Sequence, residues 1–164
     1  MKRAQIDAFC GSRETLYQRI AFFAAPTILL AGVVYVAVRY ASLPAEIPTH
    51  YNAFGEIDGW GSRGTLWLMP IIGVVCDAIM LAVSFFPQTW NVGTSVTVFN
   101  RALVYRRVRD LIADMRLSLA VMFTAMTVWH ASLPPRFPWW MGVLIGVCCT
   151  APLVRFFVRL AMKK

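Results

Sequence analysis

Residues 43–63 read LPAEIPTHYNAFGEIDGWGSR, a polar stretch that lies between two long apolar runs. The stretch combines a histidine, an asparagine, three carboxylates and several glycines and prolines, a combination found nowhere else in the chain. Prolines hold the residues before them extended, and glycines permit turns with positive φ, so a small hairpin or compact loop is predicted here. The apolar runs on both sides indicate that this loop lies at a water interface of a membrane protein.

The apolar runs are long enough to cross a membrane. Hydrophobic residues make up 59% of the chain and charged residues 15%, whereas a soluble domain is about half apolar and about a quarter charged. Segments of about 20 apolar residues span a bilayer, and their backbone must satisfy its own hydrogen bonds, so helices are expected. We predict an all-α membrane protein, a single domain over 1–164, with four transmembrane helices over about 20–40, 65–86, 112–133 and 138–158.

Lys and Arg residues are distributed unequally between the two sides of these predicted helices. Thirteen lie in the N-terminal tail, after the second span or near the C-terminus, and three lie on the opposite side. Because basic residues accumulate on the cytoplasmic side, we expect a multi-pass protein of the cytoplasmic membrane with both termini and the 87–111 linker inside. The 41–64 loop is then external. The chain has a net charge of +8, but its basic residues flank the apolar runs and form no single patch, so binding of nucleic acid is not indicated.

The end of the predicted linker carries a helical and strongly basic pattern. Apolar residues recur there at spacings of three and four, beginning near Val98. This pattern predicts a basic amphipathic helix at the cytoplasmic membrane surface, either separate from the third span or continuous with it. Its basic residues are Arg101, Arg106, Arg107, Arg109 and Arg116.

The 43–63 loop is the first candidate site. Nitrogen and oxygen ligands occur there within nine positions, and they suit a polar head group, a peptide or a divalent metal. For the metal interpretation, His130 near the outer end of the third span would join His50 and Asp58. In the alternative, these side chains satisfy the loop's own backbone and His130 donates to a carbonyl, so that no cofactor is bound. The candidate ligand-binding residues are His50, Tyr51, Asn52, Glu56, Asp58, Trp60 and Arg63.

The spacing of several residues resembles the motif of a known family. In the loop these residues are Leu43-Pro44, Ile47-Pro48, His50-Tyr51-Asn52, Gly55, Asp58-Gly59-Trp60-Gly61 and Ser62-Arg63; after the second span they are Phe86-Pro87, Asn91, Thr97, Asn100 and Tyr105-Arg106. The pattern resembles a bacterial integral-membrane domain of unknown function, which also forms the N-terminal part of SdpI-type toxin-immunity and signalling proteins. The resemblance covers roughly residues 25–130. It implies a bacterial membrane protein and no established chemistry.

Asp77 is the second candidate. A charged carboxylate in the middle of a transmembrane helix is energetically costly, so its presence there suggests a function. It could serve transport. Alternatively it forms a structural pair with Arg116 or Arg155, or stays protonated and hydrogen-bonded within the bundle.

The last span contains Gly142 and Gly146, a spacing of small residues that permits close contact between membrane helices. That contact is either within the bundle or between two copies of the chain, as in a homo-oligomer.

Three functional classes remain. The chain has no motif for a nucleophile–base pair, a phosphate-binding loop or a zinc protease, which disfavours an enzyme without excluding one that holds a metal near His50. A small transporter or channel component would depend on Asp77. The interpretation we favour is a binding or accessory protein, for immunity or sensing, whose external loop engages a peptide, a lipid or a membrane-protein partner.

Overall fold

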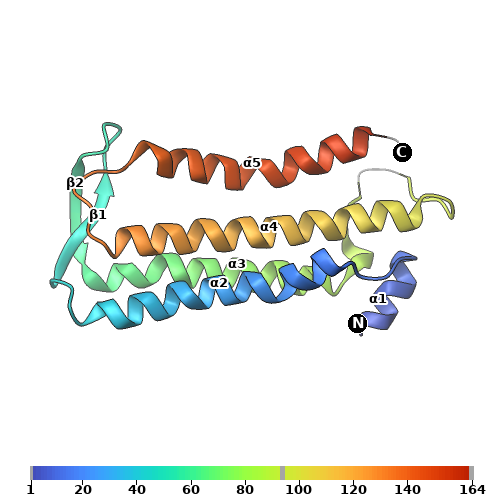
Figure 1. The fold of residues 1–164 in the computed structure, drawn as a ribbon, viewed down its shortest axis with the longest axis horizontal. Coiled ribbons are helices and arrows are strands. Elements are labelled where there is room, and N and C mark those ends of the chain that lie inside the picture. The colour runs from blue at the N-terminus through green and yellow to red at the C-terminus, as the bar shows by residue number, and fades with distance from the viewer. Residues whose placement is uncertain (1, 93–94, 163–164) are drawn as a thin grey trace.

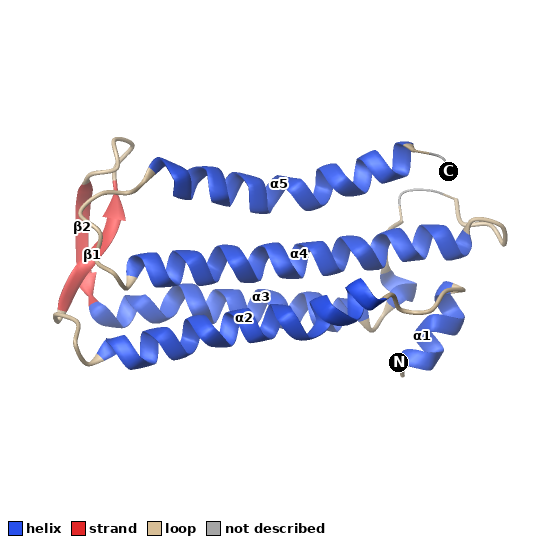
Figure 2. Cartoon of the chain, in the orientation of Figure 1, coloured by secondary structure: helices blue, strands red, loops and turns tan. Residues whose placement is uncertain are grey.

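The computed structural model describes residues 2–92 and 95–162. Four long helices run side by side, with a β-hairpin across one end and a short helix at the other (Figure 1; the strands are red in Figure 2). In chain order the elements are α1 Arg3–Cys10, α2 Leu16–Tyr40, β1 Glu46–Tyr51, β2 Ile57–Ser62, the 3₁₀ helix η1 Arg63–Trp67, α3 Leu68–Ser84, the 3₁₀ helix η2 Pro87–Thr89, α4 Arg101–His130 and α5 Trp139–Ala161.

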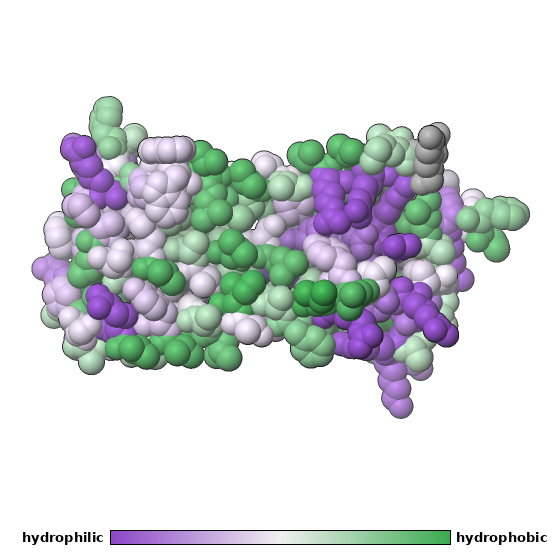
Figure 3. All heavy atoms as spheres, viewed as in Figure 1, coloured by the Kyte–Doolittle hydropathy of each residue, from purple (hydrophilic) through white to green (hydrophobic). Residues whose placement is uncertain are grey.

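The four long helices confirm the predicted all-α membrane protein. In the described part of the chain, four helical segments are long and apolar enough to cross a membrane: 16–40, 63–84, 101–130 and 139–161. Pro26 lies inside α2 without ending it. Apolar side chains cover the middle of the bundle, whereas hydrophilic side chains gather at its ends (Figure 3). We call the end with β1 and β2 the hairpin end, and the end with α1, the start of α4 and the end of α5 the basic end.

The core of the bundle is formed by α2, α3 and α4, which pack against one another, while α5 packs chiefly against α4. The helices approach closely at Gly73 of α3. A methyl group on Gly73 would lie 2.9 Å from Leu29 Cδ2 of α2 and 2.9 Å from Phe123 Cβ of α4. The absence of a side chain at this position therefore permits the three-helix contact.

The basic amphipathic segment is continuous with the third span. α4 runs from Arg101 to His130 without interruption, and it contains neither glycine nor proline. Val104, Val108 and Ile112 are buried at spacings of four, so one face of the basic segment packs against the bundle. The predicted linker 87–111 is therefore shorter than expected, since its last eleven residues belong to α4, and residues 93–94 of it lie outside the described chain.

Candidate functional site

The hairpin has a defined turn. β1 and β2 pair antiparallel, and Asn52 closes the turn because its Oδ1 accepts hydrogen bonds from the backbone N–H groups of Phe54 and Glu56 at 2.9 and 3.0 Å. Gly55 has φ +76°, and a Cβ on it would lie 2.8 Å from the carbonyl oxygen of Phe137. Both the backbone angle and the space therefore favour glycine at this position.

The hairpin is fixed to the segment between α4 and α5. The N–H of Phe137 donates to the Gly55 carbonyl at 2.8 Å, and the Tyr51 hydroxyl donates to the Pro134 carbonyl at 2.9 Å. The Tyr51 ring lies 5.2 Å from the Trp129 ring, and Phe137 packs against both. Burial raises the pKa of the Tyr51 hydroxyl above its usual range. Tyr51 and the turn of the hairpin are therefore fixed to the end of α4 and to the segment before α5.

A hollow of about 440 Å³ lies between the hairpin and the ends of α3 and α4. The hairpin forms one wall, and the other walls come from α3, α4 and the segment before α5. Tyr, Trp, Phe and Met make up half of the lining, and Thr, Asn and His add polar groups, a combination typical of ligand sites. The lining residues are Thr49, His50, Tyr51, Asn52, Ala53, Met69, Met126, Trp129, His130 and Phe137.

The structure brings His50 and Asp58 together. His50 Nδ1 donates to Asp58 Oδ1 at 2.5 Å, and both side chains are largely open to water. His130 does not join them, because its Nε2 donates to the Pro48 carbonyl at 2.7 Å and so holds β1 against α4. In residues 2–92 and 95–162, no three side chains of His, Cys, Asp or Glu are arranged to hold a metal ion. The proposed set of His50, Asp58 and His130 is therefore not assembled.

The other predicted loop residues lie outside the hollow. Glu56 pairs with Arg136 at 3.3 Å on the outer surface, and Trp60 is 60% exposed. Arg63 turns inward, where its Nη1 donates to the Leu43 carbonyl at 3.1 Å and its guanidinium lies over the Tyr40 ring. Arg63 thus connects the end of α2 to the end of the hairpin.

Asp77 lies inside the bundle and forms a two-pronged pair with Arg116. Arg116 Nε donates to Asp77 Oδ1 at 2.7 Å, and Arg116 Nη2 donates to Asp77 Oδ2 at 3.0 Å. Both side chains are almost completely buried, with exposed fractions of 4% for Arg116 and 7% for Asp77. The alternative partner from the sequence, Arg155, instead donates to Asp114 of α4.

Two acidic residues that were not among the predicted site residues join three helices at the basic end. Asp114 accepts hydrogen bonds from Tyr17 of α2 and from Arg155 of α5. One turn earlier, Asp110 accepts from Gln18 of α2 at 2.8 Å and from Arg159 of α5 at 2.9 Å. Their spacing of four within a basic helix was the available signal, since residues four apart share a face.

Gly142 and Gly146 make no close helix contact within the described chain. A methyl group on either residue would lie more than 4 Å from every neighbouring helix. The two glycines therefore face outward from α5, and a role in a homo-oligomer stays a prediction.

Comparison with known proteins relates the hairpin region to a described family. Residues 27–74, which include part of α2, the hairpin and the start of α3, match the family described as "Domain of unknown function (DUF1648)". An uncharacterized protein of Archaeoglobus fulgidus is 27% identical over 145 residues, which cover 79% of this chain and 79% of that protein. No solved structure matches the chain significantly. These matches support a family of unknown function; the relative is archaeal, so the bacterial origin implied by the loop motif stays an expectation.

Proposed function

We propose that this protein is a membrane-bound binding protein that recognises a ligand in the hollow at the hairpin end. The observation that carries the proposal is that hollow, about 440 Å³ in volume, between a fixed hairpin and the ends of α3 and α4. A rigid scaffold that presents a shaped loop is where binding sites commonly lie. The distribution of basic residues supports a protein of the cytoplasmic membrane whose hairpin end lies on the external side.

The wall chemistry favours a ligand with an apolar side chain and a hydrogen-bonding backbone. Met69, Met126 and Trp129 offer a polarizable apolar surface, which adapts to ligands of different shape. His50 and Asn52 add polar groups from the hairpin. We therefore propose a membrane-associated peptide as the ligand. The resemblance of the loop to the N-terminal part of toxin-immunity proteins supports the same choice, with immunity or sensing as the biological role.

Transport through Asp77 has less support. Both carboxylate oxygens of Asp77 accept hydrogen bonds from Arg116, and the pair is buried between α3 and α4. A carboxylate that is held in this way has a structural role, because its loss would leave the Arg116 charge buried without a partner. A proton- or ion-carrying group, by contrast, needs access to water.

The proposal predicts that filling the hollow weakens ligand recognition. Ala53 lines the hollow and is exposed, so Ala53→Trp adds a bulky ring with little effect on folding. Loss of the apolar site is expected to weaken peptide binding by about 2 kcal/mol or more, roughly thirtyfold. The measurement is survival of cells that express the protein when they are challenged with a membrane-active peptide rich in apolar side chains, together with the melting temperature of the purified protein.

The matched control is Phe54→Trp, which enlarges the neighbouring side chain. Phe54 is 86% exposed and does not line the hollow. We expect this variant to protect cells as the unmodified protein does. Protection that is equal in both variants would contradict the site, and an unmodified protein that gives no protection would contradict peptide recognition.

A further inference from the structure

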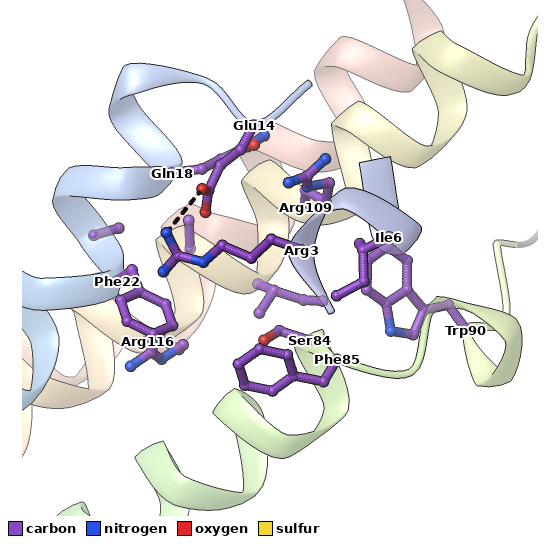
Figure 4. Close-up of a pocket in the computed structure, with 13 residues that line it drawn as sticks. Arg3, Ile6, Glu14, Gln18, Phe22, Ser84, Phe85, Trp90, Arg109 and Arg116 are labelled. Carbon is purple, nitrogen blue, oxygen red and sulfur yellow. Dashed lines mark ion pairs between the residues drawn. The ribbon is translucent and has the colours of Figure 1, made fainter. Parts of the chain in front are cut away.

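A second cavity lies at the basic end, away from the hairpin. It is bounded by α1, the start of α2, the end of α3 and the start of α4 (Figure 4). Its volume of about 60 Å³ suits a few water molecules or one small oxyanion group. Apolar side chains form much of its wall, among them Ile6, Phe22, Phe85, Trp90 and Ile112.

Three arginines line this cavity with a single carboxylate, that of Glu14. Two of the arginines are held in place by partners outside the lining. Arg109 Nη1 donates to Asp7 Oδ1 at 2.8 Å and to the Ser12 carbonyl at 3.1 Å. Arg116 uses Nε and Nη2 on Asp77, which leaves its Nη1 unused by that carboxylate. Asp7 and Asp77 thus offset the charges of Arg109 and Arg116, while the guanidinium of Arg3 faces Glu14 alone at a longer distance.

The third arginine, Arg3, is held loosely. Its Nη1 lies 3.6 Å from Glu14 Oε2, which is too long for a hydrogen bond. In residues 2–92 and 95–162 its guanidinium donates no hydrogen bond, and it lies 4.5 Å from the centre of the Phe22 ring. Figure 4 shows the Arg3 side chain extending across the cavity toward Glu14 and Phe22. Several N–H groups of the Arg3 guanidinium are thus available to donate to an anion that lies beside Glu14.

We infer that this cavity binds a phosphate group, with Arg3 as the principal donor and Glu14 as the group that competes for it. A guanidinium matches the geometry of phosphate oxygens, and basic pockets between transmembrane helices bind anionic head groups. The cavity lies where the helical segment 63–84, which is long enough to cross a membrane, ends and where the N-terminal segment meets the bundle. Lipid head groups are expected at the ends of membrane-spanning helices. An anionic phospholipid is the source that this position favours, and this inference does not depend on the ligand of the hairpin end.

The test compares two variants that break the same ion pair in opposite ways. Arg3→Ala removes the donor, and the affinity for the anion should fall about tenfold, as expected for losing hydrogen bonds to a charged group. Glu14→Gln removes the competing charge, and the affinity should rise. The measurement is the increase in melting temperature, in nanodiscs, when phosphatidylglycerol replaces phosphatidylcholine with the same acyl chains; a parallel series adds inorganic phosphate to phosphatidylcholine nanodiscs.

Arg13→Ala is the control for charge alone, because Arg13 is exposed in the same N-terminal segment and does not line the cavity. We expect it to keep the full lipid effect. Opposite responses of Arg3→Ala and Glu14→Gln to phosphatidylglycerol support a phospholipid site, and the same responses to phosphate alone support a site for a soluble phosphate. If the two variants change in the same direction, or if neither differs from Arg13→Ala, the pair is only structural and the inference is overturned.

Discussion

At the scale of single residues, the buried pair of Asp77 and Arg116 is the most consequential interaction. Each side chain is charged, almost fully buried and hydrogen-bonded to the other at two points. A buried ion pair stabilises little compared with apolar packing, but the loss of one member leaves an uncompensated charge in a medium of low polarity. Removing one member of the pair is therefore expected to destabilise the protein more than replacing both members with apolar residues.

Asp77→Ala is predicted to lower the free energy of unfolding by about 3–5 kcal/mol, because it leaves Arg116 buried without its partner. Asp77→Asn should cost less, since it keeps the shape and one acceptor oxygen. The double variant Asp77→Leu with Arg116→Met should recover most of the loss. Denaturation in mixed detergent micelles measures all three. Equal losses in the single and double variants would show that the pair itself, and not the unpaired charge, determines stability.

The sequence identified Asp77 but left its partner open. Arg116 and Arg155 both lie near the required depth, and only the rotation of α4 and α5 distinguishes them. Asp114 and Arg116 are two residues apart, so they point to nearly opposite sides of α4, one toward α2 and α5 and the other toward α3. The rotational setting of a membrane helix depends on packing with its neighbours, which the apolar pattern of a single helix does not determine.

At the scale of the elements, glycines on two helices have different roles. A methyl group added to Gly73 of α3 would lie 2.9 Å from side chains of both α2 and α4. Gly142 of α5 has open space around it in the described chain. The first position is therefore required for the bundle, whereas the second is available to a neighbouring molecule or to lipid.

Gly73→Ala is predicted to destabilise the monomer by about 1–3 kcal/mol, the usual cost of an added group in a packed core. Gly142→Ala should change the stability by no more than about 1 kcal/mol, because it alters only helix propensity. Unfolding of both variants in the same detergent provides the comparison. A loss at Gly142 as large as that at Gly73 would mean that α5 packs more closely than the structure describes.

The elements were predicted better than their contacts. Apolar length gave the four helices, and the glycines and prolines of residues 43–63 gave the hairpin, because these features depend on local sequence. Beyond the hairpin, His130 of the hollow's wall was among the predicted site residues, whereas Met69, Met126 and Phe137 were not, since they come from three different segments. The basic pattern alone also did not show whether residues 101–111 form a separate surface helix or the first part of α4.

At the scale of the whole molecule, charge separates the two ends of the bundle. Along the sequence, thirteen basic and five acidic side chains lie on the side of the basic end, which accounts for the whole net charge of +8. The hairpin side has three basic and three acidic side chains and is therefore neutral. By the positive-inside rule, this asymmetry predicts that the basic end faces the cytoplasm. In that orientation the two proposed sites lie on opposite sides of the membrane, with the hollow outside and the phosphate cavity inside.

Recognition of an external ligand requires the hairpin end to face outward, and chemical labelling of single cysteines measures this directly. In a background that lacks the four native cysteines, Ala53→Cys reports on the hairpin and Gln88→Cys on the loop after α3; both positions are exposed. In intact cells we predict that a membrane-impermeant thiol reagent labels position 53 and not position 88, while permeabilised cells show labelling of both. Labelling of position 88 without position 53 in intact cells would contradict the orientation and, with it, the proposed function.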